Sequence, residues 1–503
     1  MTSIFDSLIM GFTVAITPVN LLYALIGCVL GTMIGVLPGI GSLATISMLL
    51  SFSSQLDAVT SLIMMAGIFY GAQYGSSTTA ILCNIPGDAA SVVTCLDGHQ
   101  MARKGRAGQA LAIAALSSLL AGIIATIIIG LFTPPIARFA LNFNAPEYFS
   151  LMVLGLVACV VFSNGSVLNA FIMAAFGVLL GCIGTDVETG AQRYTFGVLQ
   201  LSEGITIVAV AMGLFGLSEI VVNLANGNKM SVLDLKYKMR DLWPSKAEFR
   251  AGTPAALRGT FIGALLGILP GAGQVLSPFA SYMIERRLSK KPGQFGEGAV
   301  EGLAGPEAAN NAAAQTSFIP LLALGIPANP VIALMLGAMV IQGIQPGPNV
   351  MVTRPEVVWG LIASMFIGNL MLVIINLPMI GVWVRLLAVP QRILFPAIVV
   401  FCCIGIYTLS GSVYDLVALA AFAAIGVLFY RAGFQAIPLL LGFILGPMLE
   451  ENLRRAMVIS QGDLFSLFQR PISATVLSIS ILLLLMTALP SFRKQRENFA
   501  GSD

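Results

Sequence analysis

Long runs of apolar residues recur from one end of the chain to the other, separated by short polar segments. Clear runs cover residues 108–133, 204–224, 357–383, 412–430 and 472–490. A helix of about 17–25 apolar residues crosses the hydrocarbon layer of a bilayer. The pattern therefore predicts an all-α polytopic membrane protein.

The composition agrees with this pattern. Of the 503 residues, 57% are hydrophobic and only 10% are charged, whereas about a quarter of a soluble protein is charged. The net charge of +3 gives no reason to expect a nucleic-acid partner. The seven cysteines lie in or beside apolar runs without paired spacing, which favours small buried side chains over disulfides or metal ligands.

Two short motifs occur twice, in the same order. GVLPGIG at 35–41 returns as GILPGAG at 267–273, and CNIPGDA at 83–89 is matched by LGIPANP at 324–330. Such self-similarity predicts two homologous halves. The expected organisation is a first transmembrane repeat at 1–224, a basic cytoplasmic linker at 225–258, a second transmembrane repeat at 259–490 and a cytoplasmic tail at 491–503.

Basic residues are placed oppositely in the two halves. After the first motif, the second half carries ERRLSKK at 285–291, whereas the first half has SFSSQLD at 51–57, without Lys or Arg. After the second motif, the first half carries ARKGR at 102–106, whereas the second half offers only Arg354. Because basic loops stay in the cytoplasm, we expect inverted-topology repeats with the N-terminus outside.

The spacing of the basic segments also predicts re-entrant hairpins. The linker and 285–291 are both basic, and the segment between them is too short for two spans. Residues 259–285 are therefore expected to enter and leave the membrane on one side, with 267–273 at the tip. By symmetry, 27–52 should form the equivalent hairpin, entering from outside.

The proline and glycines of these motifs predict breaks in helices inside the membrane. Proline lacks an N–H donor, and glycine permits conformations closed to other residues. Freed backbone groups survive there only where protein or a water-filled cavity covers them. A helix N-terminus at such a break attracts anions, and loose carbonyls bind cations. A packing kink is the alternative for one break, but paired breaks indicate a transporter's central site.

Hydroxyl and amide side chains cluster beside the motifs, and such groups can bind both a carboxylate and a cation. The predicted substrate- and ion-binding residues are Pro38, Gly39, Gly41, Ser42, Ser76, Ser77, Thr78, Thr79, Asn84, Pro86, Gly271, Gly273, Asn310, Asn311, Gln315, Thr316, Ser317 and Pro327. Serine and threonine also serve as small packing residues in membrane helices. The clusters contain no Lys or Arg, so a bound anion must be held by neutral donors, helix ends and a co-bound cation.

Ionisable groups near the motifs have three interpretations. Asp88 and Glu307 could carry a proton, bind sodium or mark helix ends. Sodium, favoured over a proton as the coupling ion, is expected near Gly39, Asn84, Gly271 and Thr316. His99, the only histidine, is interpreted as a solvated loop residue.

Enzyme signatures are absent from the sequence: there is no HExxH, no GxxxxGK[ST] and no clustered Cys/His set. The chain is therefore predicted not to be an enzyme and to need no cofactor other than its coupling ion. A membrane-embedded enzyme and a passive channel for small anions remain the alternatives.

The strings at 35–50, 69–111, 267–290 and 305–348 resemble the large membrane subunit of the tripartite tricarboxylate transporters. The resemblance implies a multi-pass permease of the bacterial inner membrane that works with a small membrane subunit and a periplasmic solute-binding protein. It implies uptake of citrate-like tricarboxylates or dicarboxylates by symport with sodium or protons. By analogy with other ion-coupled carboxylate carriers, it also suggests an elevator-type motion.

Overall fold

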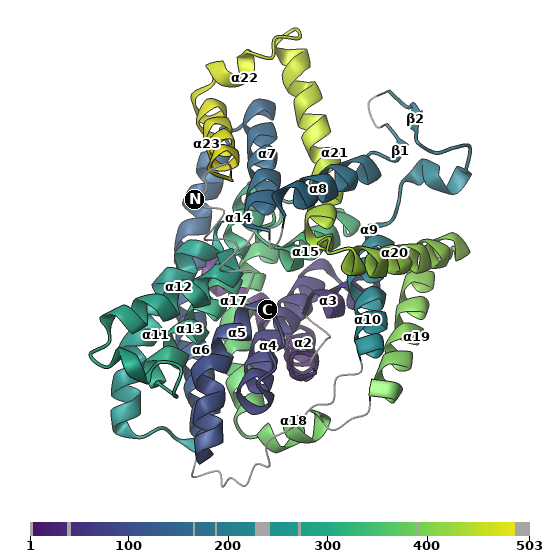
Figure 1. The fold of residues 1–503 in the computed structure, drawn as a ribbon. Coiled ribbons are helices and arrows are strands. Elements are labelled where there is room, and N and C mark those ends of the chain that lie inside the picture. The colour runs from purple at the N-terminus through teal and green to yellow at the C-terminus, as the bar shows by residue number, and fades with distance from the viewer. Residues whose placement is uncertain are drawn as a thin grey trace.

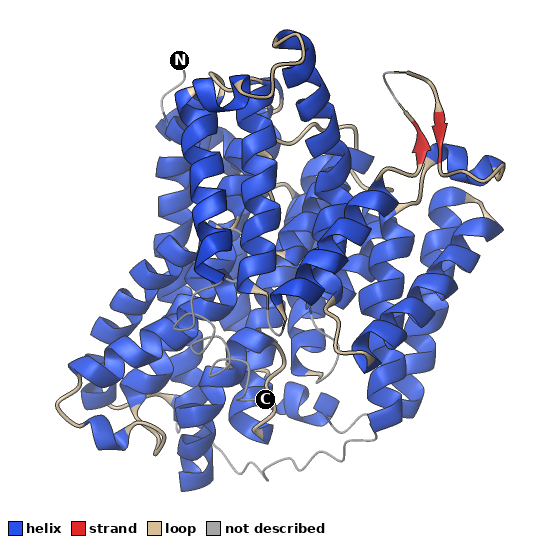
Figure 2. Ribbon diagram, turned by 45° about the horizontal axis from the view of Figure 1, so that its top comes forward, coloured by secondary structure: helices blue, strands red, loops and turns tan. Residues whose placement is uncertain are grey.

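The computed structural model describes residues 4–37, 42–163, 166–186, 189–226, 242–269, 273–387 and 391–487, and almost all of its elements are helices (Figures 1 and 2). The first half contains α1 Ile4–Ala15, α2 Pro18–Val36, α3 Ser42–Ser53, α4 Ala58–Cys83, η1 Ala89–Ser91, α5 Val92–Thr94, η2 Cys95–His99, η3 Ala102–Arg106, α6 Ala107–Ala140, α7 Ala145–Phe162, α8 Val167–Gly181, β1 Gly184–Thr185, β2 Gln192–Arg193, η4 Leu199–Glu203, α9 Ile207–Ala211, η5 Met212–Leu217 and α10 Ser218–Asn226.

The remainder of the described chain begins with α11. It contains α11 Lys246–Gly267, α12 Gly273–Leu288, η7 Pro292–Gln294, α13 Val300–Thr316, α14 Phe318–Leu324, α15 Pro330–Ile341, α16 Val350–Thr353, α17 Pro355–Asn376, α18 Ile380–Leu387, α19 Gln391–Ser410, α20 Val413–Arg431, α21 Ala436–Ile459, α22 Ser466–Gln469 and α23 Pro471–Thr487. The two strands pair antiparallel, with Gly184 opposite Arg193, and project as a hairpin beyond the helices (Figure 2).

Among the described residues, six helices are long and apolar enough to cross a membrane, which confirms the predicted fold class. They cover residues 18–36, 102–140, 145–162, 355–376, 413–431 and 436–459. Three of the apolar runs identified in the sequence coincide with helices in this group of six. The run at 204–224 is instead interrupted by the π-helix η5, and the run at 472–490 contains a shorter helix, α23.

Both halves contain a pair of helices that touch backbone to backbone. Helix α2 packs against α4, and α11 packs against α13. Each of α2 and α11 has three glycines at which an added Cβ would lie 2.1–2.4 Å from a carbonyl oxygen of the partner helix. The glycines and the residues that carry those carbonyls are Gly27 with Met64, Gly31 with Ile68, Gly35 with Ala72, Gly259 with Gly305, Gly263 with Ala309 and Gly267 with Ala313. Glycines at every fourth position let membrane helices approach this closely, and their recurrence supports the predicted repeat.

The second of these pairs continues into a hairpin, seen with α13 in Figure 1. A Cβ on Gly273, the first residue of α12, would lie 1.9 Å from the carbonyl oxygen of Leu266, so α12 begins against the last turn of α11. Farther along, both carboxylate oxygens of the buried Glu285 accept from Arg258, at 2.8 and 2.6 Å. The helices α11 and α12 therefore run antiparallel, as a hairpin requires; its re-entrant insertion stays a prediction.

Helix α11 begins at Lys246, inside the range assigned to the linker. Ser245 accepts from the backbone N–H of Glu248, and the Glu248 carboxylate accepts from that of Ser245, a capping box that starts the helix there. Burial raises the pKa of Glu248, but hydrogen bonds from Ser245 and Arg106 outweigh it and hold the pKa below its ordinary value. Arg106 belongs to the basic 102–106 segment, so this pair joins the two halves.

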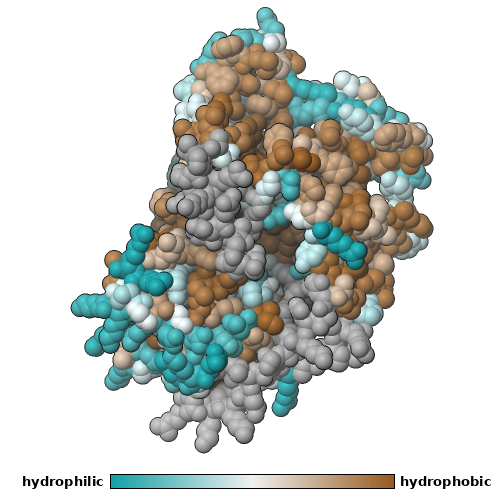
Figure 3. All heavy atoms as spheres, in the orientation of Figure 1, coloured by the Kyte–Doolittle hydropathy of each residue, from teal (hydrophilic) through white to brown (hydrophobic). Residues whose placement is uncertain are grey.

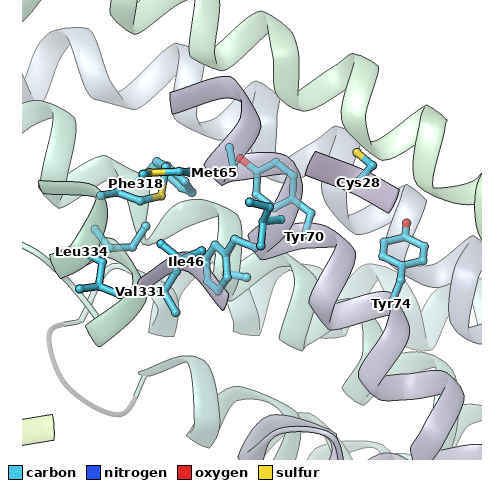
Figure 4. Close-up of a cluster of buried hydrophobic side chains, with 14 of the residues drawn as sticks. Cys28, Ile46, Met65, Tyr70, Tyr74, Phe318, Val331 and Leu334 are labelled. Carbon is cyan, nitrogen blue, oxygen red and sulfur yellow. The ribbon is translucent and has the colours of Figure 1, made fainter. Parts of the chain in front are cut away.

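The hydrophobic core lies where the two halves meet. Phe318 of α14 packs against Phe69 and Tyr70 of α4, with ring centroids 6.4 and 6.2 Å apart, and Figure 4 shows Tyr70 and Phe318 with Met65 in this cluster. Figure 3 shows hydrophobic side chains over much of the visible surface, with hydrophilic ones gathered at its lower left beside α11 and α12. Burial of shared aromatic side chains thus joins the helices that carry the repeated motifs.

Candidate functional site

The second motif breaks the helix in the same way in both halves. Asn84 caps the C-terminal end of α4, and Gly325 caps that of α14, both in the left-handed region, with φ of 56° and 72°. Each is followed by Ile-Pro, whose proline cannot donate to a continuing helix. The chain is therefore unwound over 84–88 and 325–329.

The cap that follows each break is the same, although a 3-10 helix begins after Asp88 and an α-helix begins after Asn329. Asp88 and Asn329 have nearly the same extended backbone, with φ of −144° and −150°. The side chain of Asp88 accepts from the backbone N–H of Ser91, and that of Asn329 accepts from Ile332, both at 2.9 Å. These matching N-caps show that the short sequence repeat is also a structural one.

Within each half, the two breaks lie together. The hydroxyl of Thr79 donates to the carbonyl of Val36, the last residue of α2, at 2.7 Å, and so satisfies a group freed by the end of that helix. In the second half, the amide of Asn329 donates to the side chain of Gln274, at the start of α12, at 3.3 Å. The halves also pack reciprocally, since α12 contacts η1 and α5 while α3 contacts α15.

The tips of the first motif contain several predicted residues that lie outside the described part of the chain: Pro38, Gly39, Gly41 and Gly271. The residues that follow each tip are described. Ser42 starts α3 and Gly273 starts α12, and both are buried. Two helices thus begin inside the protein directly after the repeated motif.

A buried carboxylate of the second half contacts α4 and α5 of the first half. Glu307 of α13 is only 1% exposed. One carboxylate oxygen accepts from the hydroxyl of Ser77 on α4, at 2.8 Å, and the other accepts from Thr94 of α5. Both donors belong to the first half, whereas Glu307 belongs to the second.

Polar side chains continue from Glu307 along one face of α13. Asn311 and Gln315 follow at intervals of four residues, which places all three on one stripe. Asn311 donates to Ser118 of α6 at 2.7 Å. Gln315 accepts from Thr126 of α6 at 2.8 Å and donates to Asn369 of α17 at 3.0 Å.

The other predicted residues fall outside this network. Thr78, Thr316 and Ser317 donate to carbonyls of their own helices, whereas Ser76 donates to Ser91. Asn84 and Pro86 are exposed and Pro327 is buried. Asn310 is buried, and among the described residues its amide has no hydrogen-bond partner.

A small pocket lies beside Glu307, with a cavity volume of about 20 Å³, enough for one water molecule or ion. Its polar lining comes from Tyr74, Ser77, Thr78, Ser118, Glu307 and Asn376. No basic side chain is among the described residues that line it.

From the sequence, Glu307 was identified as an ionisable group near the motifs but was not among the predicted binding residues. Apart from Ser77, the residues on other helices that contact Glu307, Asn311 and Gln315 were not predicted. Glu307, Asn311 and Gln315 share one helical spacing, a signal that could have linked them. No sequence pattern distinguishes the partners on the other helices, because single polar residues in apolar helices resemble packing residues. These partners are Thr94, Ser118, Thr126, Asn369 and Asn376. The interpretation of His99 as a loop residue is wrong: it ends the π-helix η2, with Nδ1 3.0 Å from the carbonyl oxygen of Ile81.

Comparison with known proteins identifies the family. The model of the tripartite tricarboxylate transporter TctA family matches residues 21–441. The chain is 53% identical over 497 residues, 99% of each chain, to an uncharacterized 52.8 kDa protein in the TAR-I ttuC' 3'region of Agrobacterium vitis. It is 55% identical over 241 residues, 48% of this chain, to the whole of an uncharacterized protein in the TAR-II ttuC' 3'region of the same organism.

No solved structure matches the chain. The family match covers both copies of each repeated motif, both unwound segments and the Glu307 pocket. The chain therefore belongs to the tripartite tricarboxylate transporter TctA family.

Proposed function

We propose that the chain is the permease subunit of a secondary active uptake system that carries tricarboxylates such as citrate, or dicarboxylates, across the bacterial inner membrane. A periplasmic binding protein delivers the substrate, a small membrane subunit completes the complex, and sodium or a proton supplies the driving force. Membership in a tripartite transporter family supports the general class.

The observation that carries the proposal is the pair of equivalent helix breaks, each beside the start of another helix. At Ser42 and Gly273, α3 and α12 begin inside the protein. The first turn of a helix has N–H groups without intrahelical partners and a partial positive charge, both of which stabilise a carboxylate. Broken helices of this kind are where secondary transporters bind anionic substrates.

The electrostatics of the same region support coupling to a cation. The predicted clusters at 76–79 and 310–317 contain no basic residue. A substrate with two or three carboxylates therefore meets neutral donors and helix ends, and it also meets the buried negative charge of Glu307. A cation bound nearby would offset that repulsion, which explains why substrate and ion would travel together.

The test is uptake of radiolabelled citrate and of a dicarboxylate by proteoliposomes containing all three components. We expect accumulation above the external concentration when an inward sodium gradient is imposed, and no accumulation when the binding protein is omitted. Accumulation driven only by a pH gradient would assign the coupling to protons. Equilibration without accumulation under every gradient would indicate a passive channel and refute the proposal.

A further inference from the structure

The carboxylate of Glu307 is buried without a compensating positive charge. On the surrounding helices α4, α6, α13, α17 and α18, the basic residues are Arg138 and Arg385, and both are exposed. Neutral hydroxyls of Ser77 and Thr94 donate to the carboxylate, but hydroxyls do not neutralise its charge. A buried charge without a partner is costly, so it must bind a cation or a proton.

A second residue that lines the same pocket has a side-chain oxygen without a donor among the described residues. Asn376, at the end of α17, is 5% exposed. Its Nδ2 donates to the carbonyl of Leu372 at 2.8 Å and to the hydroxyl of Thr32 at 3.3 Å. Because a carbonyl can only accept, these contacts fix which atom is the nitrogen. The other atom, Oδ1, has no hydrogen-bond partner among the described residues.

We propose that the pocket between Glu307 and Asn376 is a sodium-binding site. The polar residues of its lining offer oxygen ligands: a carboxylate, an amide carbonyl oxygen and the hydroxyls of Tyr74, Ser77, Thr78 and Ser118. Such hard ligands suit hard metal cations. The site differs from the sodium positions expected from the sequence, which lie at the motif tips and beside Asn84 and Thr316.

Two features favour sodium over a proton at this pocket. A proton on Glu307 would neutralise the carboxylate but would leave Asn376 Oδ1 unsatisfied, whereas a metal cation satisfies both. The cavity of about 20 Å³ also provides space for an ion, which protonation does not require.

The role of the ion in transport rests on the proposed function. Ser77 comes from the first half and Glu307 from the second, so sodium there would join the two halves. Its binding would therefore favour the arrangement that holds the substrate. Binding itself can be measured without a carboxylate substrate, which separates this proposal from the previous one.

The experiment measures binding of radioactive ²²Na⁺ to the full chain purified into nanodiscs, in choline chloride at constant ionic strength and without carboxylate. We expect about one sodium per chain. Glu307→Gln should lower the affinity at least tenfold, because it removes the charge while keeping nearly the same shape. Asn376→Leu should weaken binding several-fold. The control is Glu301→Gln, on the same helix but outside the pocket, and it should bind like the wild type.

Thermal unfolding of the same samples gives a second measurement. Sodium, but not choline or potassium, should raise the melting temperature of the wild type and of Glu301→Gln, and should not raise that of Glu307→Gln. If Glu307→Gln does not fold, Asn376→Leu alone decides. Unchanged sodium affinity in the folded pocket variants, or no sodium binding by the wild type, would overturn the proposal. Sodium binding without carboxylate uptake would sustain it and refute the proposed function instead.

Discussion

Replacing Gly263 by alanine tests the backbone-to-backbone packing of α11 against α13. The new Cβ would lie 2.1 Å from the carbonyl oxygen of Ala309 and 2.8 Å from its Cα and carbonyl carbon. All three are backbone atoms, so no side chain can rotate away. Restoring an ordinary contact requires the helices to separate by about 1 Å, a gap that forfeits a quarter to a half of each dispersion contact across the interface.

The expected cost follows from these distances. Overpacking a tight interior costs about 1–3 kcal/mol, and the upper end applies because two rigid helices must part. Alanine has a higher helix propensity than glycine, which offsets up to about 1 kcal/mol of this destabilisation. We therefore expect a net destabilisation of about 2 kcal/mol, which lowers the ratio of folded to unfolded protein roughly thirtyfold.

The assay is thermal unfolding of purified protein in detergent, with Gly130→Ala as the matched control. Gly130 also lies in an apolar helix, α6, but the nearest atom to its built Cβ is 4.0 Å away. The control should therefore be as stable as the wild type or slightly more so. A Gly263→Ala protein that melts at or above the wild-type temperature would refute the packing argument.

Three further predictions concern other contacts between segments. Asp97→Ala should destabilise the fold by about 1–3 kcal/mol, seen as a lower yield and melting temperature. Asp97 Oδ1 accepts from the backbone N–H groups of Gly296, Gly298 and Ala299, and the buried N–H of Ala299 would lose its acceptor. Arg470→Ala should lower the free energy of unfolding by about 2 kcal/mol, because it removes the arginine that pairs with the buried Glu147 at 2.5 Å. The double variant Arg470→Ala/Glu147→Gln should recover part of the lost melting temperature, and a double variant that recovers none would argue against the ion pair. Single cysteines at Ser54 and Ser289, in a background without the native seven, should label from opposite sides of the membrane; labelling from one side would refute inverted topology.

Much of the fold could be predicted from the sequence because apolar runs and motif repetition are local signals. The Pro-Gly and Ile-Pro strings located both kinds of interruption, and the matching caps at Asp88 and Asn329 lie directly after the Ile-Pro strings. Spans such as α21 were missed, because polar residues near its C-terminal end interrupt the apolar run. Short signals therefore predict where helices break better than they predict where long helices end.

The candidate site was less predictable, because its members come from several helices. Ser77 and Asn311 were identified beside their motifs, but nothing local linked Ser77 to Glu307 or Asn311 to Ser118. Asn376 ends a mostly apolar helix, and only its position in the fold reveals an amide oxygen without a donor among the described residues. Which polar residues share a pocket depends on helix packing, and a single sequence does not encode that in any short pattern.

The glycine contacts between α2 and α4, and between α11 and α13, also limit how this protein can move. Carbonyl oxygens of one helix occupy the space where side chains of the other would stand, so neither helix can slide or rotate past its partner without a collision. Each pair will therefore move as one rigid body. The interface of α13 with α6, joined through hydroxyls and amides that can exchange partners, is better suited to repacking when the protein changes conformation.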